Sequence, residues 1–135
     1  MPHTGPLEDR ELIRELLERY CDAVNQRDAE AWGATWAEDA DWELPHLEVN
    51  ISGRAAIVDA WKEAMEMFPF VNMMSQVGSI EIDGDRAVMR SYTAEVAVLQ
   101  DGKEIRPRGE YRDVCVKQNG EWLFAQRRFS VLHGE

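Results

Sequence analysis

Apolar residues in the first part of the chain recur at helical spacing. Between Glu8 and Gln26, arginines and glutamates occupy the opposite face, a pattern that predicts a long amphipathic helix. Asp28 is a suitable N-cap for a second helix, expected to end near Ala37, because its carboxylate can accept amide protons of the first turn. The apolar stripe of the first helix consists of Leu12, Ile13, Leu16, Leu17, Tyr20 and Val24.

A third helix is predicted after a short alternating segment. Residues 40–44 alternate between apolar and polar, and Pro45 ends that alternation. Ser52 is a suitable cap for the helix that follows, which Pro69 should end because proline cannot continue a helix. The apolar stripe of this helix consists of Ile57, Trp61, Ala64, Met65 and Phe68.

The second half of the chain has the pattern of an antiparallel sheet. Asp83-Gly84, Asp101-Gly102 and Asn119-Gly120 follow one another at intervals of 18 residues, and such pairs favour tight hairpins. Helices followed by a meander predict an α+β fold in which a curved sheet wraps around three N-terminal helices and encloses a pocket. The expected strands cover about 71–82, 86–99, 104–117 and 121–132. We expect one domain over residues 1–135, with residues 1–7 flexible.

Composition and charge exclude several classes of function. The formal charge of -11 disfavours nucleic acid and anionic membrane surfaces as partners. The longest uncharged stretch, residues 67–80, is too short to cross a bilayer. The first residues lack an export signal, and Cys21 and Cys115 lie far apart, so we expect reduced thiols and a cytoplasmic protein.

Motifs for cofactors and metals are missing from the sequence. There is no phosphate-binding glycine loop, dinucleotide fingerprint, nucleophile elbow or zinc motif. His3, His46 and His133 are too widely separated to suggest a metal centre. The sequence therefore predicts no metal and no cofactor.

Several segments follow one another in a characteristic order. A long helix carrying a tyrosine is followed by RDAEAWGATWAEDADWEL, GRAAI, IEIDGDRAVMRSY and GEYRDVCVKQNGEWLFAQRR. From about Leu7 to Leu132 the chain thereby resembles the SnoaL-like branch of the nuclear transport factor 2-like superfamily. The resemblance implies a cone-shaped α+β fold with a deep apolar pocket, commonly in a dimer. Relatives include ketosteroid isomerases, scytalone dehydratase, a dehydrochlorinase, polyketide cyclases and non-catalytic members, so the fold does not determine the function.

The resemblance carries over to the site residues only in part. Tyr20 falls where the isomerases have the tyrosine that donates a hydrogen bond to a substrate oxyanion; the alternative is a large side chain packed on the buried stripe. Asn25 and Met73 fall where scytalone dehydratase and the dehydrochlorinase have an aspartate and a histidine, and neither replacement can act as a base. The isomerase carboxylates are replaced by Leu44 and Gly109.

Other side chains would then have to transfer a proton. Asp113 can face inward by strand parity, or it can form a structural ion pair with Arg127 or Arg128. His46 lies in a loop that can close over the pocket. Asp22 lies on the first helix and is expected to face solvent.

We expect a cofactor-independent acid–base enzyme, either an isomerase, a dehydratase or other lyase, or a cyclase. Its substrate would be a small hydrophobic molecule, cyclic or aromatic and oxygenated. The catalytic candidates are Tyr20, Asn25, Asp113 and His46. The substrate-binding candidates are Trp42, Trp61, Phe68, Met73, Tyr92, Tyr111, Arg127 and Phe129.

Two further expectations concern catalysis and assembly. The missing His-Asp pair favours an alternative in which the chain is a non-catalytic module for small-molecule binding or assembly. Val88, Val114 and Val116 lie on the expected outer face of the sheet, which predicts a homodimer packed through that face.

Overall fold

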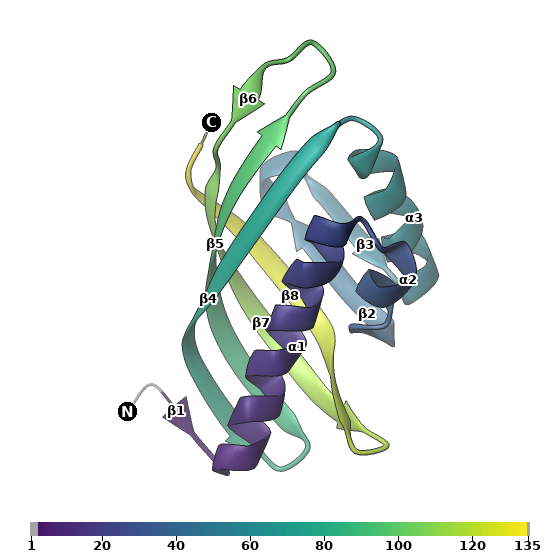
Figure 1. The fold of residues 1–135 in the computed structure, drawn as a ribbon. Helices are drawn as coiled ribbons and strands as arrows, with labels where there is room; N and C mark the ends of the chain where they lie inside the picture. The colour runs from purple at the N-terminus through teal and green to yellow at the C-terminus, as the bar shows by residue number, and fades with distance from the viewer. Residues whose placement is uncertain (1–2, 135) are drawn as a thin grey trace.

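The expected α+β fold is confirmed by a computed structural model, which describes residues 3–134. The helices are α1 (Leu7–Gln26), α2 (Ala29–Gly33), α3 (Arg54–Met65) and the short 3-10 helix η1 (Pro45–Leu47). The strands are β1 (His3–Thr4), β2 (Trp36–Leu44), β3 (Val49–Ser52), β4 (Phe70–Asp83), β5 (Arg86–Val98), β6 (Glu104–Ile105), β7 (Arg108–Gln118) and β8 (Glu121–His133). Figure 1 shows one curved, open sheet with the helices packed along it.

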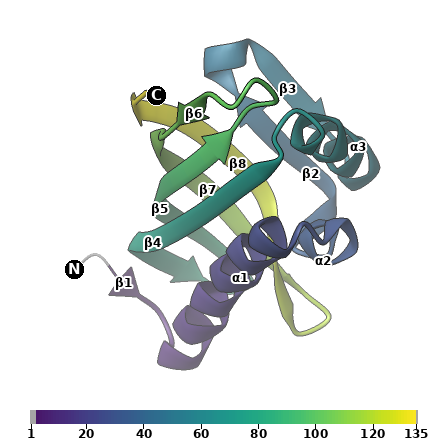
Figure 2. The same ribbon diagram turned by 45° about the horizontal axis from the view of Figure 1, so that its top comes forward.

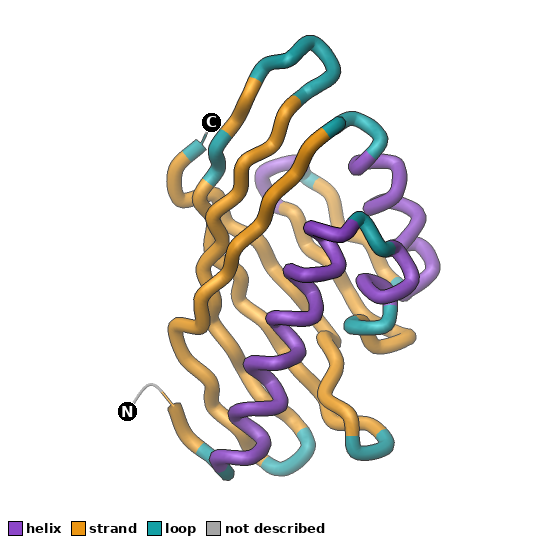
Figure 3. Tube along the Cα trace, in the orientation of Figure 1, coloured by secondary structure: helices purple, strands orange, loops and turns teal. Residues whose placement is uncertain are grey.

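The sheet contains the predicted antiparallel meander. Strands β4, β5, β7 and β8 are neighbours in that order, and Asn119 and Gly120 both have the positive φ, 53° and 79°, that a tight hairpin requires. Three additions were not predicted: β2 pairs in parallel with β8, β3 pairs with β2, and β1 pairs in parallel with β4. Figure 3 shows that these strands continue the same curved sheet.

The first helix lies along the hollow side of the sheet. Its buried stripe of Ile13, Leu16, Tyr20 and Val24 matches the predicted apolar face. The helix ends at Gln26, the next residue, Arg27, takes a left-handed conformation, and α2 and α3 follow beside β2 and β3 (Figure 2). This arrangement places Tyr20 between the helical layer and the sheet.

The second helix is shorter than expected. Asp28 caps it as predicted, accepting a hydrogen bond of 3.0 Å from the amide of Ala31. The expected end near Ala37 is wrong, because the Thr35 hydroxyl donates to the Trp32 carbonyl at 2.7 Å and stops the helix. The Thr35 carbonyl then accepts from the amide of Phe124 at 2.8 Å, and β2 begins at the next residue.

The predicted cap of the third helix is also wrong. Ser52 is the last residue of β3, and its hydroxyl donates to Asp41 on the neighbouring strand at 2.5 Å. The residue before the helix is Gly53, with a φ of 92° that side-chain-bearing residues rarely adopt. The turn therefore depends on this glycine, and no side chain caps the helix.

Two other boundaries differ from expectation. The strand expected over 104–117 is divided into β6 and β7, because Pro107 has no amide proton to donate to a ladder. In the segment 1–7, expected to be flexible, His3 and Thr4 form β1 beside β4, while residues 1–2 lie outside the described residues.

Candidate functional site

An apolar cavity of about 250 Å³ lies between α1, α3 and the hollow side of the sheet. Most of its wall is aliphatic or aromatic, and the titratable side chains in it are two phenols, one imidazole and one carboxylate. The lining residues are Tyr20, Val24, Trp42, Leu44, His46, Leu47, Trp61, Ala64, Met65, Phe68, Val71, Met73, Glu95, Ala97, Ile105, Pro107, Tyr111 and Phe129. A larger hollow of about 440 Å³ lies between α1 and β4, but its wall is largely polar and charged. Apolar walls with a few convergent polar groups are typical of small-molecule sites, so we assign the site to the first cavity.

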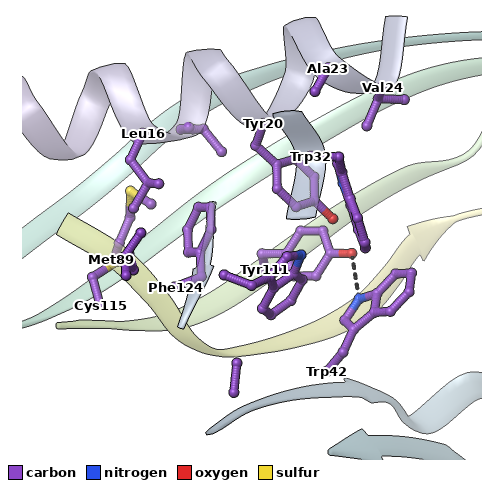
Figure 4. Close-up of a cluster of buried hydrophobic side chains, with 14 of the residues drawn as sticks. Leu16, Tyr20, Ala23, Val24, Trp32, Trp42, Met89, Tyr111, Cys115 and Phe124 are labelled. Atoms are coloured by element: carbon purple, nitrogen blue, oxygen red, sulfur yellow. Dashed lines mark hydrogen bonds between the residues drawn. The ribbon is translucent and has the colours of Figure 1, made fainter. Parts of the chain in front are cut away.

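Two phenols form the inner wall of this cavity. Tyr20 comes from α1 and Tyr111 from β7, and Figure 4 shows their hydroxyl groups directed toward the same side, near Trp42. The Tyr111 oxygen accepts a hydrogen bond of 3.1 Å from Trp42 Nε1, so its own proton remains available to another acceptor. Burial raises the pKa of both phenols, which keeps them protonated at neutral pH.

A buried cation lies behind the phenols. The Arg127 guanidinium lies 3.7 Å from the centre of the Tyr111 ring and 4.5 Å from that of Tyr20. It forms a two-pronged ion pair with Asp113, with Nε–Oδ1 and Nη2–Oδ2 distances of 2.7 and 3.2 Å. Neither residue of the pair lines the cavity.

Asp113 therefore has the geometry of the structural alternative considered from the sequence. Burial raises the pKa of its carboxyl, while the charge of Arg127 opposes that rise. Its oxygens are occupied by Arg127 and, at 3.5 Å, by the Ser91 hydroxyl. Because it is buried behind the phenols, Asp113 cannot reach a molecule in the cavity without rearrangement.

Asn25 and Met73 are adjacent, as the resemblance implies, but only Met73 reaches the cavity. The Asn25 amide donates to the Met73 carbonyl at 3.0 Å and accepts from the Met73 amide at 2.7 Å. Asn25 thereby fixes α1 to β4 through the backbone, and its side chain lies outside the cavity wall. The Met73 side chain belongs to that wall and contributes a thioether, which cannot take a proton.

The cavity contains a carboxylate that the sequence analysis missed. Glu95 is on β5, where Ser91, Thr93 and Ala97 are buried, so strand parity turns Glu95 inward as well. Its side chain is half-buried in the cavity wall, and burial raises its pKa to about 7. This alternation was the available signal, and it applies to Glu95 as directly as to Asp113.

The other predicted residues divide into two groups. Trp42, Trp61, Phe68 and Phe129 line the cavity, as does His46, whose ring centre lies 5.4 Å from that of Phe129. Tyr92 is 39% exposed and does not line the cavity, because its strand parity is opposite to that of Glu95. Asp22 is exposed on α1, as expected.

Gly109, at one of the lost isomerase carboxylates, has a packing role. A Cβ atom at this position would lie 2.2 Å from the Phe129 ring. The phenylalanine therefore occupies space that a side chain at position 109 would need. Phe129 is also one of the residues that line the cavity.

Among residues 3–134, no group of three or more His, Cys, Asp or Glu side chains is placed to hold a metal ion. No helix there combines the length and apolar character needed to span a membrane.

Comparisons with known proteins identify the family of this fold. Residues 5–128 match the model of the SnoaL-like domain. A proposed aromatic ring hydroxylase from Novosphingobium aromaticivorans superposes with a TM-score of 0.89 at 23% identity, covering 98% of this chain and 96% of that one. A proposed scytalone dehydratase from the same species gives 0.88 at 19% identity, with coverages of 96% and 87%.

A third solved structure has a similar fold. The type 3 hexachlorocyclohexane dehydrochlorinase LinA of Novosphingobium barchaimii gives a TM-score of 0.86 at 15% identity, covering 96% of this chain and 90% of that one. A search of curated proteins found no match. Because the family model covers nearly the whole chain, this protein belongs to the SnoaL-like domain family.

Proposed function

We propose that this protein is a cofactor-independent acid–base enzyme acting on a small hydrophobic, cyclic or aromatic, oxygenated molecule. The observation that carries the proposal is that two protonated phenols, Tyr20 and Tyr111, reach one apolar cavity. At about 250 Å³ the cavity is below the usual ~300–1,000 Å³ of drug-sized sites, so the substrate is small.

The phenols are suited to stabilise an oxyanion. A substrate oxygen that accepts a phenol proton gains negative charge as a neighbouring C–H bond breaks, and a fixed donor in a dry site stabilises that charge strongly. The Arg127 cation partly offsets the rise that burial produces in the pKa of both phenols, which makes them stronger donors. Isomerisation, elimination of a small group and ring closure can all use such an oxyanion.

The comparisons support this class of chemistry without selecting a reaction. Two solved structures with a similar fold are named for a dehydratase and for a dehydrochlorinase. Their identity to this chain is below 25%, so the likeness bears on the fold. The reaction itself is inferred from the residues of the cavity.

Assembly and location are also part of this proposal. We propose a homodimer packed through the outer sheet face, where Val88 is 47% exposed beside Val114 and Val116. We propose a cytoplasmic location, in keeping with the unpaired thiols of Cys21 and Cys115.

A second candidate function is small-molecule binding without catalysis. The observation in its favour is that Asn25 and Met73, which the resemblance places at the aspartate and histidine positions, offer no base, and the Asn25 amide is hydrogen-bonded to the Met73 backbone. A binding module would keep the cavity and lose the ability to move a proton. Binding and turnover must therefore be measured separately.

The test uses two bicyclic probes. 2-Naphthol reports binding by isothermal titration calorimetry, and 2-tetralone, a ketone with acidic C–H bonds, reports proton transfer by deuterium exchange in D₂O followed by NMR. We expect the protein to bind 2-naphthol and to accelerate exchange, and Tyr20→Phe or Tyr111→Phe to lower the exchange rate on the order of 100-fold.

The matched control is Tyr92→Phe, which removes a phenol outside the cavity and should leave both readouts unchanged. Binding without exchange would favour the binding module. Absence of both would contradict the proposed function.

A further inference from the structure

Glu95 lines the apolar cavity and is paired across the sheet with another residue of its wall. It is the direct cross-strand partner of Met73, because β4 and β5 pair in that register. Cross-strand partners have Cβ atoms about 5 Å apart on the same face of a sheet. The Glu95 side chain therefore lies next to that of Met73, which also lines the cavity.

The backbone around Glu95 holds it in place. The Glu95 amide donates to the Pro107 carbonyl at 3.1 Å, at the interruption between β6 and β7. Pro107 and Ile105 thereby close the cavity on that side. The side chain is directed into a wall whose other members on β4 and β5 are Val71, Met73 and Ala97.

Among the described residues, the Glu95 carboxylate forms no ion pair. Burial accounts for the rise of its pKa to about 7, and the described residues supply no ion pair or hydrogen bond that would oppose that rise. Asp113, by contrast, is neutralised by Arg127 at 2.7 Å. Glu95 is thus the acidic side chain of the cavity that can take up and release a proton near neutral pH.

The phenols and the carboxylate share one space. Glu95 is close enough to Tyr111 for its charge to raise the pKa of that phenol, and both line the cavity together with Tyr20. A ketone bound with its oxygen at the phenols would therefore have its adjacent carbon available to a carboxylate in the same apolar cavity. Donors at the oxygen and a base at the adjacent carbon are the requirements for forming an enol or enolate.

We propose that Glu95 is the proton-transferring catalytic residue of this site, and that its substrates are small neutral carbonyl compounds with a C–H bond next to the carbonyl. This inference rests on the proposed function. Glu95 takes the proton from that carbon, the C–H electron pair forms the C=C bond of the enolate, and the carbonyl electrons move onto the oxygen held by the phenols. For exchange, the protonated Glu95 first trades its proton for a deuteron of the solvent and delivers that deuteron to the same carbon as the enolate reverts to the ketone; for isomerisation, it delivers the proton to a different carbon of a conjugated enolate.

Charge selects the substrate class. The wall is apolar apart from Glu95, His46 and the two phenols, so a carboxylate- or phosphate-bearing molecule would lose hydration without gaining a cationic partner. The buried cation, Arg127, is already paired with Asp113. The net charge of -11 adds repulsion at longer range.

Several titratable groups face Glu95 and must be separated from it. Tyr20 and Cys21 come from α1, Tyr111 from β7 and His46 from η1, with the Arg127 cation behind the phenols. Burial raises the pKa of the phenols and of Cys21 above their ordinary values. The exchange rate is therefore also measured across pH in His46→Gln. We expect the change in rate near pH 7, the limb of the profile that we assign to Glu95, to persist in this variant.

The experiment compares deuterium exchange into 2-tetralone across pH for the wild-type protein, Glu95→Gln and Glu81→Gln. Glu81 is an exposed strand carboxylate outside the cavity and serves as the matched control. We expect Glu95→Gln to bind 2-naphthol as the wild type does but to exchange on the order of 100-fold more slowly or worse, with no limb near pH 7. Glu81→Gln should match the wild type.

The possible outcomes separate this inference from the proposed function. If Glu95→Gln exchanges as fast as the wild type, Glu95 is not the proton-transferring group, although the proposed function stands. If the wild type binds 2-naphthol but never accelerates exchange, both are overturned. If Glu95→Gln still exchanges with the same pH dependence near 7 and His46→Gln loses that dependence, Glu95 is not the proton-transferring group and the assignment moves to His46.

Discussion

Glu95→Gln is predicted to stabilise the protein at alkaline pH, although it removes a charge. The folded-state pKa of Glu95 is raised from 4.5 to about 7 by burial. The folded state therefore binds this proton more tightly than the unfolded state. The contribution of this tighter proton binding to the free energy of unfolding is fully present below about pH 4.5 and is lost as the pH rises through about 7. A glutamine at this position does not titrate and loses nothing over that window.

The magnitude follows from the size of the shift. A difference of about 2.5 pH units at about 1.36 kcal/mol per unit gives about 3.4 kcal/mol across the full window. Between pH 4.5 and 8 the part of that difference expressed is about 3 kcal/mol. The unfolding free energy of Glu95→Gln, relative to the wild type, should therefore rise by up to about 3 kcal/mol between these two pH values.

Urea unfolding at pH 4.5 and pH 8 measures this difference directly. Other titrating groups, such as Asp9, whose pKa is lowered by Trp122 and Lys117, are common to both proteins and cancel in the comparison. Glu81→Gln should show no comparable pH-dependent gain, since Glu81 is exposed. A Glu95→Gln minus wild-type difference that is the same at both pH values would refute the reasoning that Glu95 is a desolvated carboxylate.

Three other substitutions test the packing around the cavity. Gly109→Ala should lower the free energy of unfolding by about 1–3 kcal/mol and weaken 2-naphthol binding, because the Phe129 ring lies 2.2 Å from the position of the new Cβ and must move. Unchanged 2-naphthol affinity in calorimetry would contradict this. Arg127→Met should cost about 3–5 kcal/mol in urea unfolding because it leaves Asp113 buried without a partner, and adding Asp113→Leu should recover much of that loss. Tyr20→Phe should lower stability by no more than about 0.5–1.5 kcal/mol, and a larger loss in the same assay would indicate a structural hydrogen bond.

The architecture was predictable where local signals and tertiary structure agree. The Asp-Gly and Asn-Gly pairs determine the hairpins, and the first helix has a single apolar stripe that is buried as a unit. Trp36 shows the limit of this reasoning. Trp32 and Trp36 are at helical spacing and both are fully buried, so the pattern cannot show that one ends a helix and the other starts a strand.

The candidate site was predictable in its aromatic wall but not in its acidic group. On β5 the inward positions include Ser91 and Thr93, so the inward face does not differ from the outward one in polarity, and parity alone does not draw attention to Glu95. The role of Asn25 depends on two backbone hydrogen bonds to a strand 48 residues away. Such a contact follows from the packing of α1 on β4, which no local pattern of the sequence specifies.

The central claim is that a substrate oxygen binds between Tyr20 and Tyr111 in the apolar cavity. A crystal structure of the complex with 2-naphthol tests this most directly. The account predicts the naphthol oxygen within about 2.6–3.2 Å of at least one of the two phenol oxygens, with the ring carbons toward Glu95. A naphthol bound in the polar hollow between α1 and β4, or with its hydroxyl turned away from both phenols, would contradict the account.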